Sequence, residues 1–394
     1  MVRAVFAGLA LALSAATPGG AAPATQAQGP PAPEDGSEPF KLASGPAIYL
    51  SGRINDHPVE MLLDSGATGT VVDKKFADRI GLKPTGTIRV AGVAGAIQGG
   101  AASGVTISVG TFVLAHQDVT IADLAPLSAL MNRPLDMILG RNAFEAAVVD
   151  IDFPAGRIAF REPSTYQPPQ HAVAVKLTDA SDGFFYVPVS IEGKRPVKAE
   201  LDLGQEMSLS ISRTYSDKQK LLKGRRTSTM LIAGVGGTSI WNVLRVRSLA
   251  IGGVAFHDLP AYVSHGGELP RKEASVGLDV WTRFHLVVDL HAGKLWLVPE
   301  ANATSMAFAH DRLGLGMVRD GDSFKVANVA VDSPAAAAGW KTGDVVTAIN
   351  GRRIDASYFD GDAHRDWGED PAGTRISFTM ADGSVRTLTL ADYF

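Results

Sequence analysis

The sequence predicts a mainly β protein made of two related lobes and a separate C-terminal unit. A length of 394 residues exceeds one ordinary domain, and 42 Gly and 22 Pro indicate many turns between short strands. Several segments recur in the same order at offsets of 138 to 142 residues, which indicates an internal duplication. No basic block accompanies the net charge of -4, so we expect no nucleic-acid partner.

The N-terminal segment has the features of a secretory signal. Arg3 precedes the apolar run "AVFAGLALALSAA" and the small-residue stretch "TPGGAAPA". We therefore expect a signal peptide over residues 1–22 and a periplasmic or secreted protein. An uncleaved anchor is the alternative, but about thirteen apolar residues are short for a bilayer, so no stable membrane insertion is expected after cleavage. Residues 23–43, rich in Ala, Pro, Gly and Gln, are expected to form a disordered leader.

The chain lacks cysteine, which excludes disulfides, a thiol nucleophile and Cys-ligated zinc. It contains no HExxH, no G-x-S-x-G and no phosphate-binding G-x-x-x-x-G-K motif. We therefore expect no metal and no cofactor.

The duplication predicts a first lobe over residues 44–163 and a second over 170–300. Three pairs of segments define it: "LLDSGATGTVV" (62–72) with "ELDLGQEMSLSIS" (200–212), "AGVAG" (91–95) with "AGVGG" (233–237), and "VVDIDFPAGRIAF" (148–160) with "VVDLHAGKLWLV" (287–298). The last pair reads as hairpins that turn at Ala-Gly. The Pro-containing stretch 162–170 suits a linker between the lobes.

One helix is expected in each lobe after the first repeated segment. Asp73 is a candidate N-cap and Gly81 a candidate stop in the first lobe, and Ser212 and Gly224 have these places in the second.

Asp64 and Asp202 are the candidate catalytic residues, 138 positions apart. Each follows an apolar strand and precedes a Gly by two residues, so the duplication predicts that both carboxylates meet at a pseudo-twofold axis. Two carboxylates at close range cannot both ionise easily and share one proton. Such a pair can activate a water and protonate an amide nitrogen, which is general acid–base hydrolysis of a peptide bond.

The motifs "DSGATGTVV" and "DMILG" (136–140) closely resemble the signatures of retropepsin-like aspartic proteases, and the duplication is similar to a single-chain, pepsin-like arrangement. The resemblance implies two β-barrel lobes with Asp64 and Asp202 as the dyad. It also implies that the segments 138–140 and 275–277 pack behind the two active loops. The other implied site residues are the active-site supports Ser65, Gly66, Thr68 and Gly204 and the substrate-covering hairpin glycines Gly92, Gly95, Gly234 and Gly237.

The second lobe departs from the family pattern at two positions. Leu203 stands where a Ser or Thr hydroxyl usually bonds across to the other lobe, and Glu206 stands opposite Thr68. Glu206 would add a negative charge that raises the pKa of the dyad if it points inward. Asp150 and Asp289 also repeat, but they precede turns and are interpreted as structural.

The C-terminal unit, residues 307–394, resembles a PDZ domain in "LGLGMV" (313–318) and "DSPAAAAGWKTGDVVTAINGRRI" (332–354). Ser333 can cap a short helix that begins at Pro334, and Asn350-Gly351 fits a hairpin turn. The resemblance implies that backbone N–H groups around Leu315, Gly316 and Met317 receive the terminal carboxylate of a C-terminal peptide ligand. The alternative is a packing module that binds nothing.

These observations predict an exported aspartic endopeptidase that acts on peptide or protein substrates. Two alternatives stay open. One is a catalytically degenerate scaffold that holds peptides, with Leu203 and Glu206 as its support. The other builds the site from two chains, although the duplication makes that unnecessary and we expect a monomer.

Overall fold

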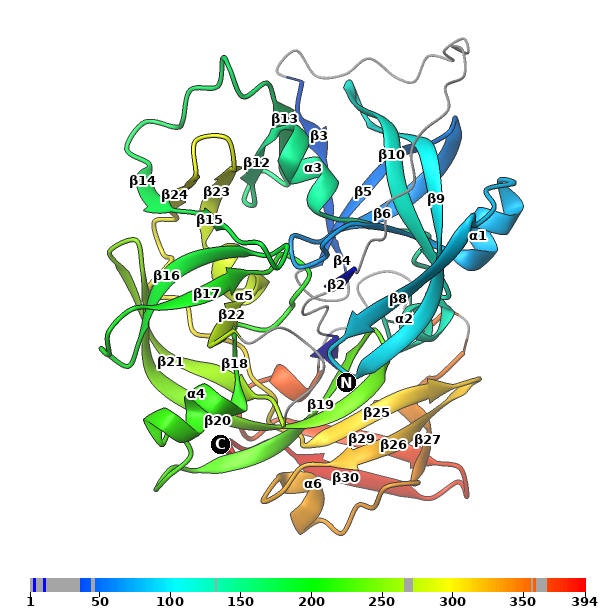
Figure 1. The fold of residues 1–394 in the computed structure, drawn as a ribbon. Coiled ribbons are helices and arrows are strands. Elements are labelled where there is room, and N and C mark those ends of the chain that lie inside the picture. The colour runs from blue at the N-terminus through cyan, green and yellow to red at the C-terminus, as the bar shows by residue number, and fades with distance from the viewer. Residues whose placement is uncertain are drawn as a thin grey trace.

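A computed structural model describes residues 3–4, 10–11, 36–43, 47–131, 133–265, 272–355, 357–358 and 367–394. Figure 1 shows three units: a first lobe drawn in blue to cyan, a second lobe in green to yellow, and a C-terminal unit in orange to red. One hydrophobic core runs through both lobes, and the C-terminal unit has a core of its own.

The first lobe is a nine-stranded sheet in which β9 also pairs with β5, so that the sheet closes on itself. Its order is β2-β8-β9-β10-β7-β11-β6-β5-β4. The elements are β2 (Ala10–Leu11), β4 (Lys41–Ala43), β5 (Ala47–Ile54), β6 (His57–Leu63), β7 (Thr70–Asp73), α1 (Lys74–Arg79), β8 (Gly86–Gly92), β9 (Gly95–Val109), β10 (Phe112–Ala122), α2 (Ala125–Met131), β11 (Met137–Leu139) and α3 (Arg141–Ala146).

The second lobe repeats this sheet strand for strand. Its order is β1-β19-β20-β21-β18-β22-β17-β16-β15, with β20 also paired to β16. The elements are β1 (Arg3–Ala4), β15 (Thr178–Asp179), β16 (Phe185–Ile191), β17 (Val197–Leu201), β18 (Leu209–Ile211), α4 (Arg213–Gln219), β19 (Thr227–Gly234), β20 (Gly237–Ile251), β21 (Val254–Val263), β22 (Ala274–Val276) and α5 (Leu278–Trp281). The shared order confirms the predicted duplication.

A six-stranded sheet joins the two lobes in the order β14-β24-β23-β12-β13-β3. Its strands are β3 (Glu38–Pro39), β12 (Val148–Asp152), β13 (Arg157–Arg161), β14 (Val173–Lys176), β23 (Phe284–Asp289) and β24 (Lys294–Pro299). The repeated hairpins therefore pair with each other, with Asp150 opposite Val287. The Asp150 carboxylate contacts Nε2 of His285 at 2.6 Å and accepts a hydrogen bond from Tyr166. This residue is thus part of the joint between the lobes.

The helices begin where the sequence predicts. The side chains of Asp73 and Ser212 accept hydrogen bonds from the backbone N–H groups of Phe76 and Tyr215, which lack partners inside their own helices. The prediction that the second helix runs to Gly224 is wrong. It ends at Gln219 because Lys220 takes a left-handed conformation, with φ of 55°.

The C-terminal unit is a sheet in the order β25-β26-β27-β29-β30, with β28 paired to β27. Its elements are β25 (Leu315–Asp320), β26 (Ser323–Val329), α6 (Pro334–Ala337), β27 (Val345–Ile349), β28 (Arg352–Arg353), the 3-10 helix η2 (Trp367–Glu369), β29 (Arg375–Met380) and β30 (Val385–Thr389). Ser333 caps α6 as predicted, and both Asn350 and Gly351 have positive φ in the turn between β27 and β28.

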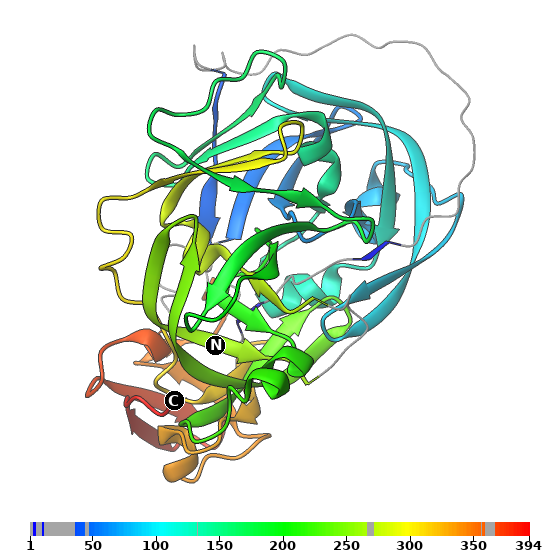
Figure 2. The ribbon, with the colours of Figure 1, turned by 60° about the vertical axis from the view of Figure 1, so that its left-hand side comes forward.

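This unit packs against strand β19 of the second lobe, and both views place it there (Figures 1 and 2). The buried side chains of Leu231 and Ala233 in β19 meet Val318 and Ala327 of the C-terminal sheet, together with Leu130 of α2. The hydroxyl of Ser228 donates a hydrogen bond to the carbonyl of Val331. The C-terminal unit is therefore in direct contact with a strand that runs to the tip of the second hairpin, residues 234–237.

The predicted disordered leader, residues 23–43, ends earlier than expected. Glu38–Pro39 pairs with β13 and Lys41–Ala43 pairs with β5, because the closing sheets satisfy the backbone groups of this polar segment. Residues 23–35 lie outside the described residues, as does most of the predicted signal peptide. Within the described ranges, no helix combines the length and the apolar character needed to cross a bilayer.

Candidate active site

Asp64 and Asp202 stand directly after strands β6 and β17. The backbone N–H of Asp64 donates to the carbonyl of Leu139 at 3.0 Å, and that of Asp202 donates to Val276 at 3.1 Å. β11 and β22 run parallel to these strands in the same register, so the segments 138–140 and 275–277 lie behind the two Asp loops as predicted. Equivalent strands thus hold the two carboxylates in equivalent places.

Each carboxylate lies at the lobe interface, close to the glycine of the opposite lobe. A Cβ at Gly66 would lie 2.7 Å from Oδ1 of Asp202, and a Cβ at Gly204 would overlap the carboxyl group of Asp64. Each Asp also accepts a hydrogen bond from the Gly of its own loop, at 2.7 Å from Gly66 and 3.0 Å from Gly204. A side chain in place of either glycine would therefore collide with the carboxylate of the opposite lobe.

Burial makes this pair hard to ionise. Asp64 and Asp202 are 1% and 0% exposed. Burial raises the pKa of Asp64, and hydrogen bonds from the backbone of Gly66 and the charge of Lys272 counteract this in part. Burial and then the charge of Asp64 raise the pKa of Asp202 well above its ordinary value. The two groups therefore titrate as one unit that retains a proton at higher pH than an exposed carboxylate would.

Ser65 links the lobes through a single hydroxyl. Its Oγ donates to the carbonyl of Leu201 at 2.7 Å and accepts from the N–H of Leu203 at 2.9 Å. Leu203 occupies the equivalent position in the second lobe, where its side chain is fully buried in the common core. The hydroxyl link predicted to be missing on that side is indeed replaced by apolar packing.

We expect Ser65→Ala to lower the free energy of unfolding by about 1–3 kcal/mol, because it leaves a buried N–H and a buried carbonyl of the second lobe without this partner. Chemical denaturation measures this change. Ser103→Ala, at an exposed position, is the matched control and should change stability little. Equal effects of the two substitutions would contradict a role for Ser65 in joining the lobes.

Thr68 and Glu206 lie at the interface between the lobes. A Cβ at Gly183 of the second lobe would lie 2.9 Å from the methyl group of Thr68. Glu206 is 7% exposed, and after burial its charge is the main cause that raises the pKa of Tyr49 in the first lobe. The charge of Glu206 in the second lobe therefore affects the ionisation of the Tyr49 phenol in the first lobe.

The four hairpin glycines lie at two tips that meet each other. Gly92 is paired with Gly95 at the end of β8–β9, and Gly234 with Gly237 at the end of β19–β20. The N–H of Ala94 in the first tip donates to the carbonyl of Val235 in the second at 3.3 Å. The strands of both hairpins also pair with the N-terminal strands: β2 with β8 and β1 with β19.

A buried ion pair that the sequence analysis missed lies near the dyad. Glu200 in β17 is two residues before Asp202, so their side chains share a face of the strand. Its carboxylate is fully buried and pairs with the ammonium of Lys272, which lies 5.3 Å from the ring centroid of Phe184. Burial lowers the pKa of Lys272 to about 7, and the charge of Asp64 counteracts part of this effect.

The first lobe has apolar residues at the equivalent positions, which are Leu62 and Leu135. Both belong to a buried apolar cluster with Ile138. The repeat could therefore have revealed the ion pair, since aligning "MLLD" with "AELD" places Glu200 opposite Leu62. The residues around Lys272 in the sequence do not indicate that it pairs with Glu200. The pairing of β17 with β22 brings the two residues together in the fold.

Leu315, Gly316 and Met317, the predicted peptide-binding residues, form the start of edge strand β25. They are buried, and a Cβ at Gly316 would lie 2.8 Å from Cβ of Leu231 in β19. The predicted carboxylate-binding segment therefore lies against the second lobe rather than apart from it. Across the described residues, no group of three His, Asp or Glu side chains is arranged to hold a metal ion.

Comparison with known families agrees with this architecture. Residues 50–143 and 187–280 each match the aspartyl protease family, and residues 312–389 match the PDZ domain family. A search of curated proteins gives no match. Among solved structures, the chain is similar to the aspartic proteinase from Irpex lacteus, with 14% sequence identity and a TM-score of 0.44, over 68% of this chain and 98% of the other.

Proposed function

We propose that this chain is an exported aspartic endopeptidase, because its two lobes match the aspartyl protease family and its C-terminal unit matches the PDZ domain family. One observation carries the catalytic part: two equivalent buried carboxylates, each packed against the glycine of the opposite lobe. Both lie in one chain, so a second chain is not needed to assemble the pair.

The catalytic step follows from the shared proton. The ionised carboxylate takes a proton from a water held between Asp64 and Asp202, and that water attacks the carbonyl carbon of the peptide bond. The protonated carboxylate supplies a proton to the substrate as the bond to nitrogen breaks. The pair then has its single proton again, so no covalent intermediate with the protein is required.

An extended polypeptide is the proposed substrate. The pairing of β1 with β19 and of β2 with β8 supports this, because strands of both hairpins accept an extended backbone as an added strand. We propose that the hairpin tips cover the substrate and that the PDZ domain binds substrate or partner peptides. The Arg3-led apolar segment supports a periplasmic or secreted location.

The pH profile of peptide hydrolysis tests this function. The pair is active when it holds one proton, so activity falls when pH drops through the lower apparent pKa and when it rises through the upper one. Burial raises the pKa of both acids, so we expect a bell-shaped profile displaced toward neutral pH relative to an exposed carboxylate pair. The rate of cleavage of an unfolded peptide, measured from about pH 3 to 9, checks this. A rate that only rises with pH would instead indicate a single general base.

A further inference from the structure

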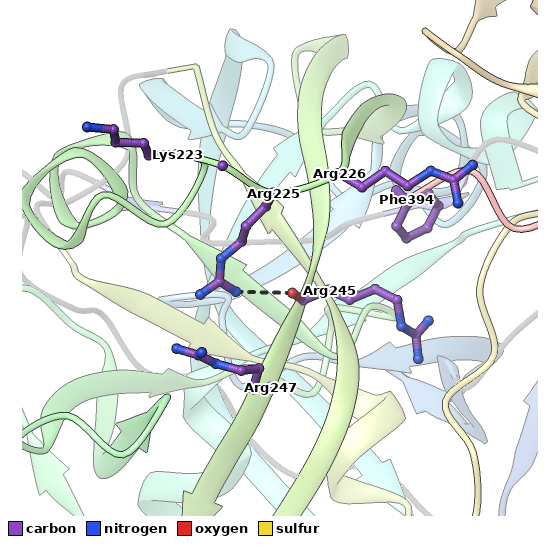
Figure 3. A pocket seen from close by; sticks show the side chains of 7 residues that line it. Lys223, Arg225, Arg226, Arg245, Arg247 and Phe394 are labelled. Atoms are coloured by element: carbon purple, nitrogen blue, oxygen red, sulfur yellow. Dashed lines mark hydrogen bonds between the residues drawn. The ribbon is translucent and has the colours of Figure 1, made fainter.

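A basic cavity lies in the second lobe, at the end of the β19–β20 hairpin opposite its tip. Its volume is about 560 Å³, and it is lined by Lys223, Gly224, Arg225, Arg226, Arg245, Arg247 and Phe394. Five of these seven residues are cationic, and Figure 3 labels them with Phe394. The cavity is separate from the dyad, and the mechanism above does not use it.

Buried and surface carboxylates hold three of the arginines in place. Glu192, whose side chain is 1% exposed, accepts a hydrogen bond from Arg225 at 2.6 Å and one from Arg247 at 3.0 Å. Arg225 also donates to the backbone carbonyl of Arg245 at 3.3 Å (Figure 3). The Arg245 guanidinium forms a fork on Asp258, at 2.7 and 2.9 Å. These guanidinium groups are therefore oriented before any ligand arrives, which reduces the entropy lost on binding.

The cavity keeps an excess of positive charge. Hydrogen bonds from Arg225 are the largest cause that lowers the pKa of Glu192 to about 2, so this residue is an anion at any physiological pH. Glu192 and Asp258 offset only two of the five cations. Within the described ranges, neither Lys223 nor Arg226 forms an ion pair, and both are exposed. A chain with a net charge of -4 thus presents a local site for anions.

We propose that this basic cavity binds an acidic segment of the polypeptide substrate. Arg245 and Arg247 are two residues apart in β20, and their guanidinium groups lie on opposite sides of the strand, that of Arg245 on Asp258 in β21 and that of Arg247 on Glu192 after β16 (Figure 3). A segment with several Asp or Glu side chains carries the negative charges that complement this excess of cations. A single concave site of this size suits a few carboxylates, whereas duplex nucleic acid requires a long basic surface. The choice of ligand rests on the proposed function.

Binding to the full-length Asp64→Asn variant tests this inference without requiring catalysis. The probe is a fluorescent peptide that alternates Glu with Val, and anisotropy measures its Kd. We expect Lys223→Ala/Arg226→Ala to weaken binding about tenfold, and salt to weaken binding to the unsubstituted cavity. Arg195→Ala/Lys198→Ala removes the same charges from exposed sites of the same lobe and should change Kd little.

Three outcomes would overturn the inference: no binding of the peptide, equal effects of the two double variants, or tighter binding of a short oligonucleotide or of pyrophosphate than of the peptide. In the active chain, an acidic extension of a cleavable peptide should lower KM, and the cavity variant should abolish that gain with kcat unchanged. Binding without any hydrolysis by the active chain would contradict the proposed endopeptidase while leaving the acidic-segment site intact.

Discussion

Asp64→Asn is expected to reduce the rate of peptide hydrolysis by about 10²–10⁴-fold, and Asp202→Asn to have an effect of the same order. An amide cannot exchange a proton at this position, so neither variant can both take a proton from water and return one to the substrate. Initial rates on an unfolded peptide measure the loss. The variants should stay folded, since Asn is isosteric and removes a buried acid whose ionised form is unfavourable.

Asp289→Asn is the matched control. This Asp also recurs in the repeat, but its carboxylate accepts a hydrogen bond from the N–H of Ala292 in a turn of the sheet that joins the lobes. Its substitution should leave kcat nearly unchanged. Full activity in Asp202→Asn would show that the second Asp has no catalytic part. A wild-type chain that binds peptides but cleaves none would favour the degenerate scaffold, for which Leu203 and Glu206 are the sequence support.

Gly204→Ala is expected to cause the second large loss, through geometry rather than chemistry. The new methyl group would overlap the carboxyl group of Asp64, so the loops must move apart. A displacement of about 1 Å between catalytic groups costs on the order of 10²-fold in rate. Overpacking at the buried site should also lower the free energy of unfolding by about 1–3 kcal/mol. Steady-state kinetics and chemical denaturation measure the two effects.

Gly86→Ala separates this effect from a general cost of replacing glycine in a strand. Gly86 begins β8, and a Cβ there would meet no atom within 4 Å. It should therefore retain both activity and stability. Unchanged kinetics in Gly204→Ala would mean that the two carboxylates are not held together through this glycine.

The duplicated fold was predictable because it leaves repeated local patterns. Apolar strands that end in an Asp, the Gly-rich hairpin tips and the Ala-Gly hairpins each appear twice in the same order. The structure confirms two lobes with the same strand order and a PDZ domain. Local patterns failed at boundaries: Gly224 looked like a helix stop, but Lys220 ends the helix, and residues 38–43 looked disordered but pair with existing strands. The predicted signal peptide and cleavage remain predictions.

The sequence alone determined the identity of the two acids and of the glycines beside them, because carboxylate chemistry and the absence of a side chain are properties of single residues. Only the tertiary structure decided what surrounds them. It showed that one hydroxyl, on Ser65, makes both bonds to the second lobe, and that Lys272 reaches Glu200 beside the dyad. It also placed the PDZ domain on β19 and gathered residues 223–226, 245 and 247 into one basic cavity. These contacts join residues far apart in the chain, and their energies depend on burial and distance, which only the packed fold sets.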